Sequence, residues 1–133
     1  MTGPADVVRR HYEIFNRADF DAWGELLTPD FTVHHASMGD TVGRDAYLKG
    51  VRFYRESFPD VTVEITRTLE GGDLAAAQFA STATFAADWL GVPATGKRWV
   101  LPAMGFFRVE GEQLAETWFV EDATAWFQGL AAT

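Results

Sequence analysis

The chain has 133 residues, of which 11 are Lys or Arg and 19 are Asp or Glu, so its net charge at pH 7 is -8. This length predicts one domain over residues 1–133, and the acidic balance argues against nucleic acid, whose phosphates would be repelled. Without cysteine the chain has no disulfides, thiol nucleophiles or cysteine-ligated metals. No apolar run reaches the roughly 18 residues needed to span a bilayer, so we expect no membrane partner. The first residues lack the basic and apolar regions of a signal peptide, so we expect a cytoplasmic protein.

Aromatic residues form 14% of the chain, with 5 Trp and 11 Phe. Large rings fill hydrophobic cores, and they also line pockets for flat apolar ligands. Their number therefore fits a filled core with an oligomer interface as well as a ligand cavity.

The first half of the chain has the 3.6-residue periodicity of helices. Pro4 and Asp6 suit a first helical turn, and the apolar spacing predicts a helix from there to Phe15. Asp19 can cap a short second helix that ends at Thr28. A strand over 31–35, a loop over 37–43 and a third amphipathic helix over 44–58 follow.

The second half has the period of two that is typical of strands. Alternation predicts strands over 61–69, 74–85, 99–109 and 114–120, and then a closing helix over 123–130. Helices followed by an antiparallel meander indicate an α+β fold, with the helices covering one face of the sheet. If the sheet curls strongly, the result is a cone with an open end where a ligand can enter.

The last predicted strand carries a candidate catalytic carboxylate. Trp118, Val120 and Asp122 are separated by steps of two and share a face, which we expect to point into the core because Trp118 and Val120 are apolar. A carboxylate in poorly solvated surroundings is a stronger base and can remove a proton next to a carbonyl. Asp122 also precedes a predicted helix, where Asp is a favoured N-cap, so the spacing leaves both roles open.

Two consecutive histidines stand at the end of the first predicted strand. His34 and His35 point to opposite faces, so at most one of them faces a cavity. Adjacent strand histidines do not chelate one metal ion, and no third ligand has a suitable spacing, so no metal is expected. The chain also lacks a Gly-x-Ser-x-Gly elbow, a phosphate-binding loop and a dinucleotide fingerprint, which leaves hydrolase, nucleotide and NAD classes without support.

Several short motifs occur in a recognisable order along the chain. They are Tyr12 with Phe15-Asn16, Asp19, Pro29-Asp30-Phe31-Thr32-Val33-His34, Gly43-Arg44, Phe58-Pro59-Asp60-Val61, Gly91-Val92-Pro93-Ala94-Thr95-Gly96-Lys97, and Glu116-Thr117-Trp118 with Asp122. In this order they resemble the SnoaL-like polyketide cyclases, also called ester cyclases, of the nuclear transport factor 2-like and ketosteroid isomerase-like superfamily, over residues 7–130. The resemblance implies a cone-shaped fold with an apolar pocket. It also implies that an intramolecular aldol reaction, without metal or organic cofactor, closes the last ring of an aromatic polyketide.

The resemblance further implies roles for single residues. The family's acid/base aspartate corresponds to Asp122, and its histidine after the Asp-Phe strand corresponds to His34, which would orient or polarise a substrate oxygen. Phe85 stands where these cyclases often carry a histidine, and an apolar ring cannot donate a hydrogen bond to an enolate oxygen.

The sequence thus predicts a cofactor-free cyclase or isomerase for a small apolar polyketide-like compound, with a pocket lined by Tyr12, Phe85, Trp99, Phe106 and Trp118. Shape-templated pericyclic closure, with Asp122 structural, and epoxide opening fit the same pocket. A non-catalytic binding or dimerisation module is the alternative from another class. A homodimer through the outer sheet face is compatible with each of them, and the preference for Arg over Lys indicates a bacterial source.

Overall fold

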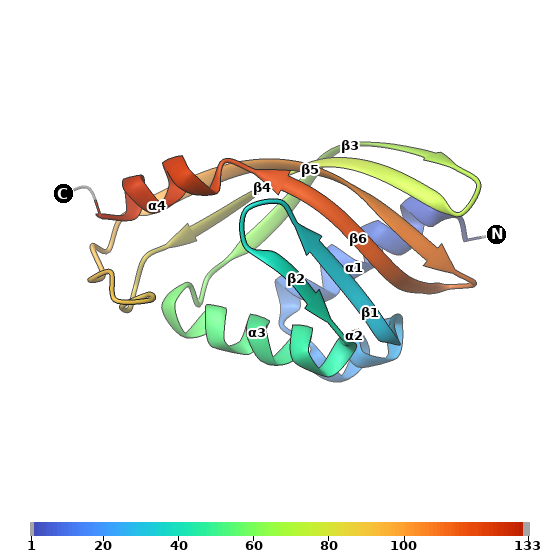
Figure 1. Ribbon diagram of the computed structural model, residues 1–133, viewed down its shortest axis with the longest axis horizontal. Coiled ribbons are helices and arrows are strands. Elements are labelled where there is room, and N and C mark those ends of the chain that lie inside the picture. The colour runs from blue at the N-terminus through green and yellow to red at the C-terminus, as the bar shows by residue number, and fades with distance from the viewer. Residues whose placement is uncertain (1, 132–133) are drawn as a thin grey trace.

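The computed structural model describes residues 2–131, which form four helices and one six-stranded sheet (Figure 1). In chain order the elements are α1 (Pro4–Arg17), α2 (Phe20–Leu26), β1 (Leu27–His35), β2 (Gly39–Val42), α3 (Arg44–Ser57), β3 (Thr62–Gly71), β4 (Leu74–Thr84), β5 (Arg98–Glu110), β6 (Gln113–Glu121) and α4 (Ala123–Ala131). The predicted α+β class is confirmed. None of the described helices has the length and apolar character needed to cross a membrane.

One predicted loop is wrong, because residues 39–42 form β2 and pair with β1 as a hairpin. The chain reverses at Gly39, whose φ of 85° lies in the region that glycine adopts without strain. All four residues of β2 are exposed or half-buried. The strand therefore has no alternation of apolar residues that could have revealed it.

The strand order is β2-β1-β6-β5-β4-β3, and all neighbours are antiparallel except β1 and β6, which run parallel. The sheet arches over α1 and α3, as Figure 1 shows, and α4 continues from the end of β6 beside the start of β5. Since parallel strands end at the same edge of a sheet, the last residues of β1 and β6 meet there. This edge positions the candidate site.

The concave side of the sheet and the helices enclose an aromatic core. Five of its rings are among the largest fully buried side chains, namely Trp23, Phe31, Phe58, Phe85 and Phe107. The apolar face of α1 packs into the same core through Val7, Val8, Ile14 and Phe15. Much of the aromatic content therefore serves packing.

Strand β6 shows that the sheet face predicted to point inward is the outer one. Trp118 is 37% exposed and Val120 is 52% exposed, whereas Thr117 is only 4% exposed. The inner face carries Thr117, Phe119 and Glu121. The prediction was wrong because it assigned the set with Trp118 and Val120 to the core, whereas both faces of β6 carry apolar side chains and the aromatic core lies on the side of Phe119.

Candidate functional site

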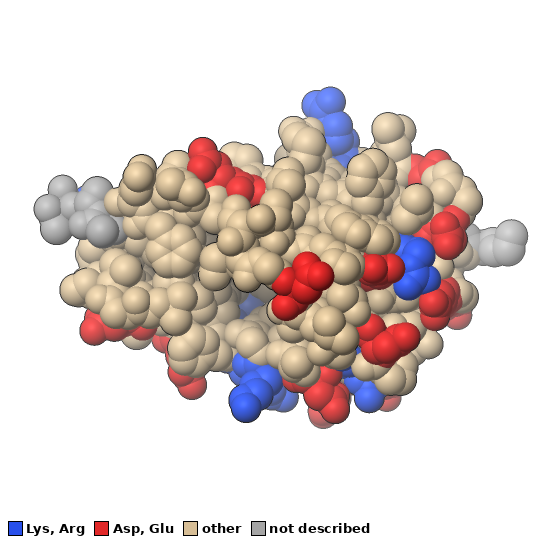
Figure 2. Space-filling model, in the orientation of Figure 1, with Lys and Arg blue, Asp and Glu red and all other residues tan. Residues whose placement is uncertain are grey.

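A cavity of about 340 Å³ lies between the inner face of the sheet, α1, α3 and α4. Figure 2 shows a hollow in this face of the molecule, with both acidic and basic side chains near its rim. The volume is at the lower end for ligand pockets and corresponds to roughly eleven water molecules at about 30 Å³ each. Its walls are mainly aromatic, including Tyr12, Phe15, Tyr47, Tyr54, Trp89, Phe107, Phe119, Trp126 and Phe127.

Glu121 is the one carboxylate among the described residues that line this interior cavity. It is the last residue of β6, next to the end of β1, and its Oε1 lies 2.7 Å from Nε2 of His35. The two side chains are 18% and 10% exposed, respectively. The parallel pairing of β1 and β6 therefore places an acid and an imidazole together at the cavity edge.

The backbone fixes which nitrogen of His35 carries the proton. Its Nδ1 accepts hydrogen bonds from the N–H groups of Ser37, at 3.1 Å, and Met38, at 3.0 Å. Nδ1 must therefore be unprotonated, so Nε2 carries the proton and donates a hydrogen bond to the Glu121 carboxylate. His35, held in this way, orients the carboxylate of Glu121.

Three phenol groups face the same cavity from the helices. Burial raises the pKa of Tyr12, and the nearby Tyr47 and Glu121 raise it further. Burial likewise raises the pKa of Tyr47 and of Tyr54, with a further contribution from Glu121 at Tyr54. Within residues 2–131 the three hydroxyls have no hydrogen-bond partner, so they remain protonated donors that are available to a ligand.

This arrangement supports acid–base chemistry on a ligand. A carboxylate with one oxygen bound to His35 keeps a second oxygen that can accept a proton. The phenols can donate hydrogen bonds to an oxygen on which negative charge develops. The described His, Asp and Glu side chains form no group of three or more that could hold a metal ion.

Asp122 occupies a different position from the one predicted. Its Oδ1 accepts a hydrogen bond from Ala125 N–H at 3.1 Å, and its carbonyl oxygen accepts one from Trp126 N–H at 3.0 Å. These are the contacts of a helix N-cap on α4. Asp122 lines a separate cleft of about 460 Å³, together with Phe85 and Trp99.

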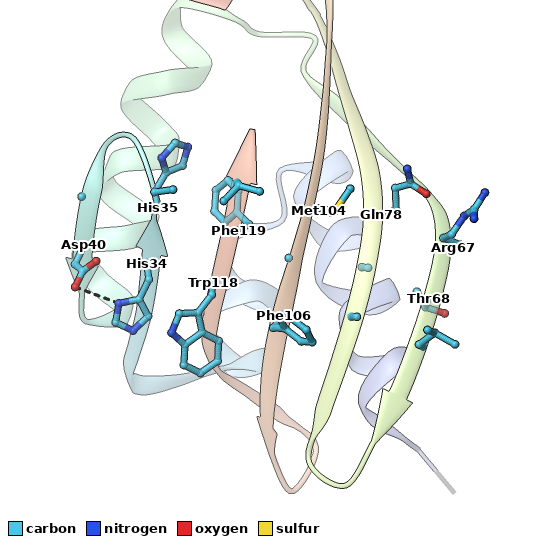
Figure 3. Close-up of a pocket in the computed structure, with 17 residues that line it drawn as sticks. His34, His35, Asp40, Arg67, Thr68, Gln78, Met104, Phe106, Trp118 and Phe119 are labelled. Atoms are coloured by element: carbon cyan, nitrogen blue, oxygen red, sulfur yellow. Dashed lines mark ion pairs between the residues drawn. The ribbon is translucent and has the colours of Figure 1, made fainter. Parts of the chain in front are cut away.

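His34, Phe106 and Trp118 lie on the outer face of the sheet and line a groove of about 940 Å³ (Figure 3). The His34 and Trp118 rings stack with centroids 5.4 Å apart. Of the predicted site residues, only Tyr12 lines the interior cavity. The structure therefore separates Asp122 from His34.

Both ring nitrogens of His34 contact carboxylates. Nε2 lies 2.6 Å from Glu116 and Nδ1 lies 3.1 Å from Asp40. The hydrogen bond to Glu116, followed by that to Asp40, raises the pKa of His34. Arg108 completes the network with a 3.1 Å contact to Glu116, so His34, Glu116, Asp40 and Arg108 are paired with one another.

Sequence reasoning missed Glu121 and His35. The period of two correctly placed Thr117, Phe119 and Glu121 opposite Trp118 and Val120, and it allowed only one of the two histidines to face inward. It fails at the start of β6, where the pairing with β5 shifts register and Leu114 and Ala115 are both buried. The parallel contact between β1 and β6 joins residues 86 positions apart, and no local pattern predicts it.

A strongly curved sheet around a cavity with one carboxylate defines a cone-shaped protein of the nuclear transport factor 2-like class. The chain belongs to the SnoaL-like polyketide cyclase family, whose profile matches residues 5–130. This membership confirms the resemblance seen in the sequence and supports a cyclase or isomerase kind of role.

Solved structures agree with this fold. IdmH of Streptomyces antibioticus, described as a "putative polyketide cyclase", is 26% identical, with 98% of this chain and 100% of that chain covered and a TM-score of 0.87. A protein of Jannaschia sp. CCS1 with a similar description is 23% identical, with coverage of 98% and 92% and a TM-score of 0.87. One of Acidithiobacillus ferrooxidans is 24% identical, with coverage of 98% and 97% and a TM-score of 0.85. No protein of curated function matches the chain at a significant level.

Proposed function

We propose that the interior cavity catalyses a cofactor-free cyclisation or isomerisation of a small polyketide-like ketone, with Glu121 as the base. The observation that carries this proposal is the position of Glu121, which is the one lining carboxylate among the described residues and is oriented by His35 at 2.7 Å. Family membership supports the reaction class.

The proposed step is an intramolecular aldol closure. The free oxygen of Glu121 takes a proton from the carbon next to a ketone, and the electron pair of that C–H bond forms an enolate. The enolate carbon then bonds to a second carbonyl carbon, whose oxygen becomes an alkoxide and regains the proton from Glu121. Tyr12, Tyr47 and Tyr54 donate hydrogen bonds to the charged oxygens, and the aromatic walls hold the chain in a folded conformer, which can contribute about 7–11 kcal/mol.

The first half of this step can be measured with a probe in place of the natural substrate. β-Tetralone is a bicyclic ketone with an acidic C–H beside its carbonyl, and its exchange of hydrogen for deuterium in D₂O is followed by NMR. We expect the native protein to accelerate this exchange. Glu121→Gln keeps the shape but removes the base, so exchange should fall by about 10²- to 10⁴-fold.

Asp122→Asn is the matched control, because Asn is also a good N-cap and α4 should remain in place. If Glu121 is the base, this variant keeps nearly native exchange. Asp122 as the base is the competing proposal from the sequence. Strong loss in Asp122→Asn together with normal exchange in Glu121→Gln would establish it and refute ours.

Apolar walls also suit closure by shape alone, without a base. Glu121→Gln would then still close the ring of the natural substrate at a nearly native rate. Binding of β-tetralone with no acceleration of exchange in any variant would instead favour a binding module. Epoxide opening by paired acids is not proposed, because Glu121 has no second carboxylate beside it among the described residues that line the cavity.

We also propose a homodimer through the outer face of the sheet. The five longer strands, at about 4.8 Å spacing and about 30 Å length, give a face of roughly 700 Å², close to the roughly 800 Å² that each partner buries in a stable interface. Its exposed apolar side chains include Leu69, Val100, Met104, Phe106, Trp118 and Val120, and the paired charges around His34 lie on the same face. Sedimentation should show a dimer that Phe106→Glu dissociates, and a native monomer at high concentration would refute the proposed dimer.

The predicted cytoplasmic location remains a prediction that cell fractionation tests.

A further inference from the structure

His11 is a buried histidine for which the proposed step has no role. It lies on α1, is 2% exposed and belongs to the lining of the interior cavity. Its ring contacts Tyr12, with centroids 4.6 Å apart, and Trp23, with centroids 5.4 Å apart. A polar ring buried this deeply needs partners for its nitrogen atoms.

One nitrogen has its partner within the core. The indole Nε1 of Trp23 lies 2.9 Å from Nδ1 of His11. An indole N–H can only donate, so Nδ1 must be the acceptor and the proton of the neutral ring must be on Nε2. Burial lowers the pKa of His11 to about 3, so the ring stays neutral and keeps this single N–H donor.

The second nitrogen faces the cavity without a partner. Among the hydrogen bonds within residues 2–131, none involves Nε2 of His11. Nε2 is also not one of the unpartnered polar atoms that are enclosed by protein, so it has surface open to the cavity. An unused donor in such a place favours a ligand that brings an acceptor.

Thr117 lies in the same region, but its hydroxyl is not open to the cavity. It is 4% exposed, and its Oγ1 is enclosed by protein and has no hydrogen-bond partner in the described part of the chain. Thr117 is opposite Phe107 on β5, and the Phe107 ring centroid lies 6.5 Å from that of His11. Nε2–H of His11 is therefore the donor that this part of the cavity offers to a ligand.

We propose that Nε2–H of His11 forms a subsite that binds a carbonyl or phenol oxygen of the ligand. The subsite rests on the proposed function only in using the same cavity. It orients the ligand through one oxygen and leaves other carbons free to approach Glu121. It selects ligands with a neutral acceptor, because a neutral imidazole offers a hydrogen bond without a positive charge.

The test compares two probes of nearly the same shape, β-tetralone and tetralin, which lacks the carbonyl oxygen. We expect calorimetry to show that the native protein binds β-tetralone more tightly by about 2- to 13-fold, the ratio that one net hydrogen bond gives. His11→Asn should reduce this ratio, whereas the isosteric Thr117→Val, which removes a hydroxyl enclosed by protein, is the control and should keep it. In His11→Asn the amide oxygen can still accept from Trp23 while the donor toward the cavity is lost.

A measurement on the native protein avoids any effect of a substitution on folding. Long-range ¹H–¹⁵N NMR should show His11 protonated on Nε2, and this signal should shift with β-tetralone but not with tetralin. A proton on Nδ1, equal affinity for both probes, or an unchanged ratio in His11→Asn would overturn the subsite. Glu121→Gln should keep the native ratio, so a failure of the proposed base and a failure of this subsite are distinguishable.

Discussion

Asn16 allows the clearest stability prediction, because one side chain makes two defined hydrogen bonds to an edge strand. Its Nδ2 donates to the carbonyl of Val63 at 2.9 Å, and its Oδ1 accepts from the N–H of Val63 at 2.8 Å. β3 has no neighbouring strand on that side, so the amide takes the place of a missing strand. Asn16 therefore anchors the helix that carries His11 and Tyr12 to the sheet.

Asn16→Ala removes both hydrogen bonds and leaves two backbone groups under α1 without partners. At about 0.5–1.5 kcal/mol for each bond, the free energy of unfolding should fall by about 2 kcal/mol, and by more if water cannot reach Val63. With a urea slope of roughly 2 kcal/mol per M, the midpoint should fall by about 1 M.

Urea unfolding followed by tryptophan fluorescence measures this change, and amide hydrogen exchange locates it at Val63. The exposed Glu13→Ala on the same helix is the control and should change stability by less than about 0.5 kcal/mol. If Asn16→Ala resembles that control and the Val63 amide stays protected, the clamp contributes nothing and the reasoning is refuted.

Three further predictions concern packing and pH. A Cβ at Gly105 would lie 2.6 Å from Cβ of Phe119, so Gly105→Ala should strongly lower the stability of the protein in thermal unfolding. Gly50→Ala, in open space within α3, is the control and should raise the stability by about 0.5–1 kcal/mol. Equal effects of the two substitutions would contradict the packing of β5 on β6. The raised pKa of His34 stabilises the fold below the ordinary pKa of 6.5, and the lowered pKa of Glu116, due first to His34 and then to Arg108, stabilises it above 4.5. His34→Gln should therefore lower the free energy of unfolding most between these two pH values, by about 1 kcal/mol or less, and least near pH 9. A cost that grows with pH would disprove this. The lowered pKa of His11 stabilises the fold above pH 6.5, and this contribution is lost as the pH falls toward about 3. From pH 6.5 downward, urea titrations should therefore show His11→Asn losing less stability than the native protein, by about 1.4 kcal/mol per pH unit. Parallel curves for the two proteins would rule out a buried neutral ring.

The local pattern of the sequence predicted most of the fold. Helices at 4–15 and 44–58 and strands in the second half follow from periodicity, because burial of one face imposes a period on each element. The second helix was predicted to end at Thr28, but it ends at Leu26 and β1 begins at Leu27. The order of motifs added the family and the cone. The hairpin strand at 39–42 was missed because all of its residues are exposed or half-buried.

The sequence predicted the candidate site poorly, and the reason is geometric. Alternation along β6 divides the residues into two faces but does not say which one is concave, and here both faces carry apolar side chains. The choice between Glu121 and Asp122, and between His35 and His34, depends on the curvature of the sheet and on the parallel pairing of β1 with β6.

By itself, then, the sequence determined the elements, their amphipathic faces and the family of this protein, since these depend on neighbours along the chain. Only the tertiary structure decided which carboxylate meets a histidine inside the cavity and which histidine pairs with carboxylates on the outer face. These contacts join residues more than 80 positions apart, His35 with Glu121 and His34 with Glu116. Their formation depends on how the whole sheet curves around α1 and α3.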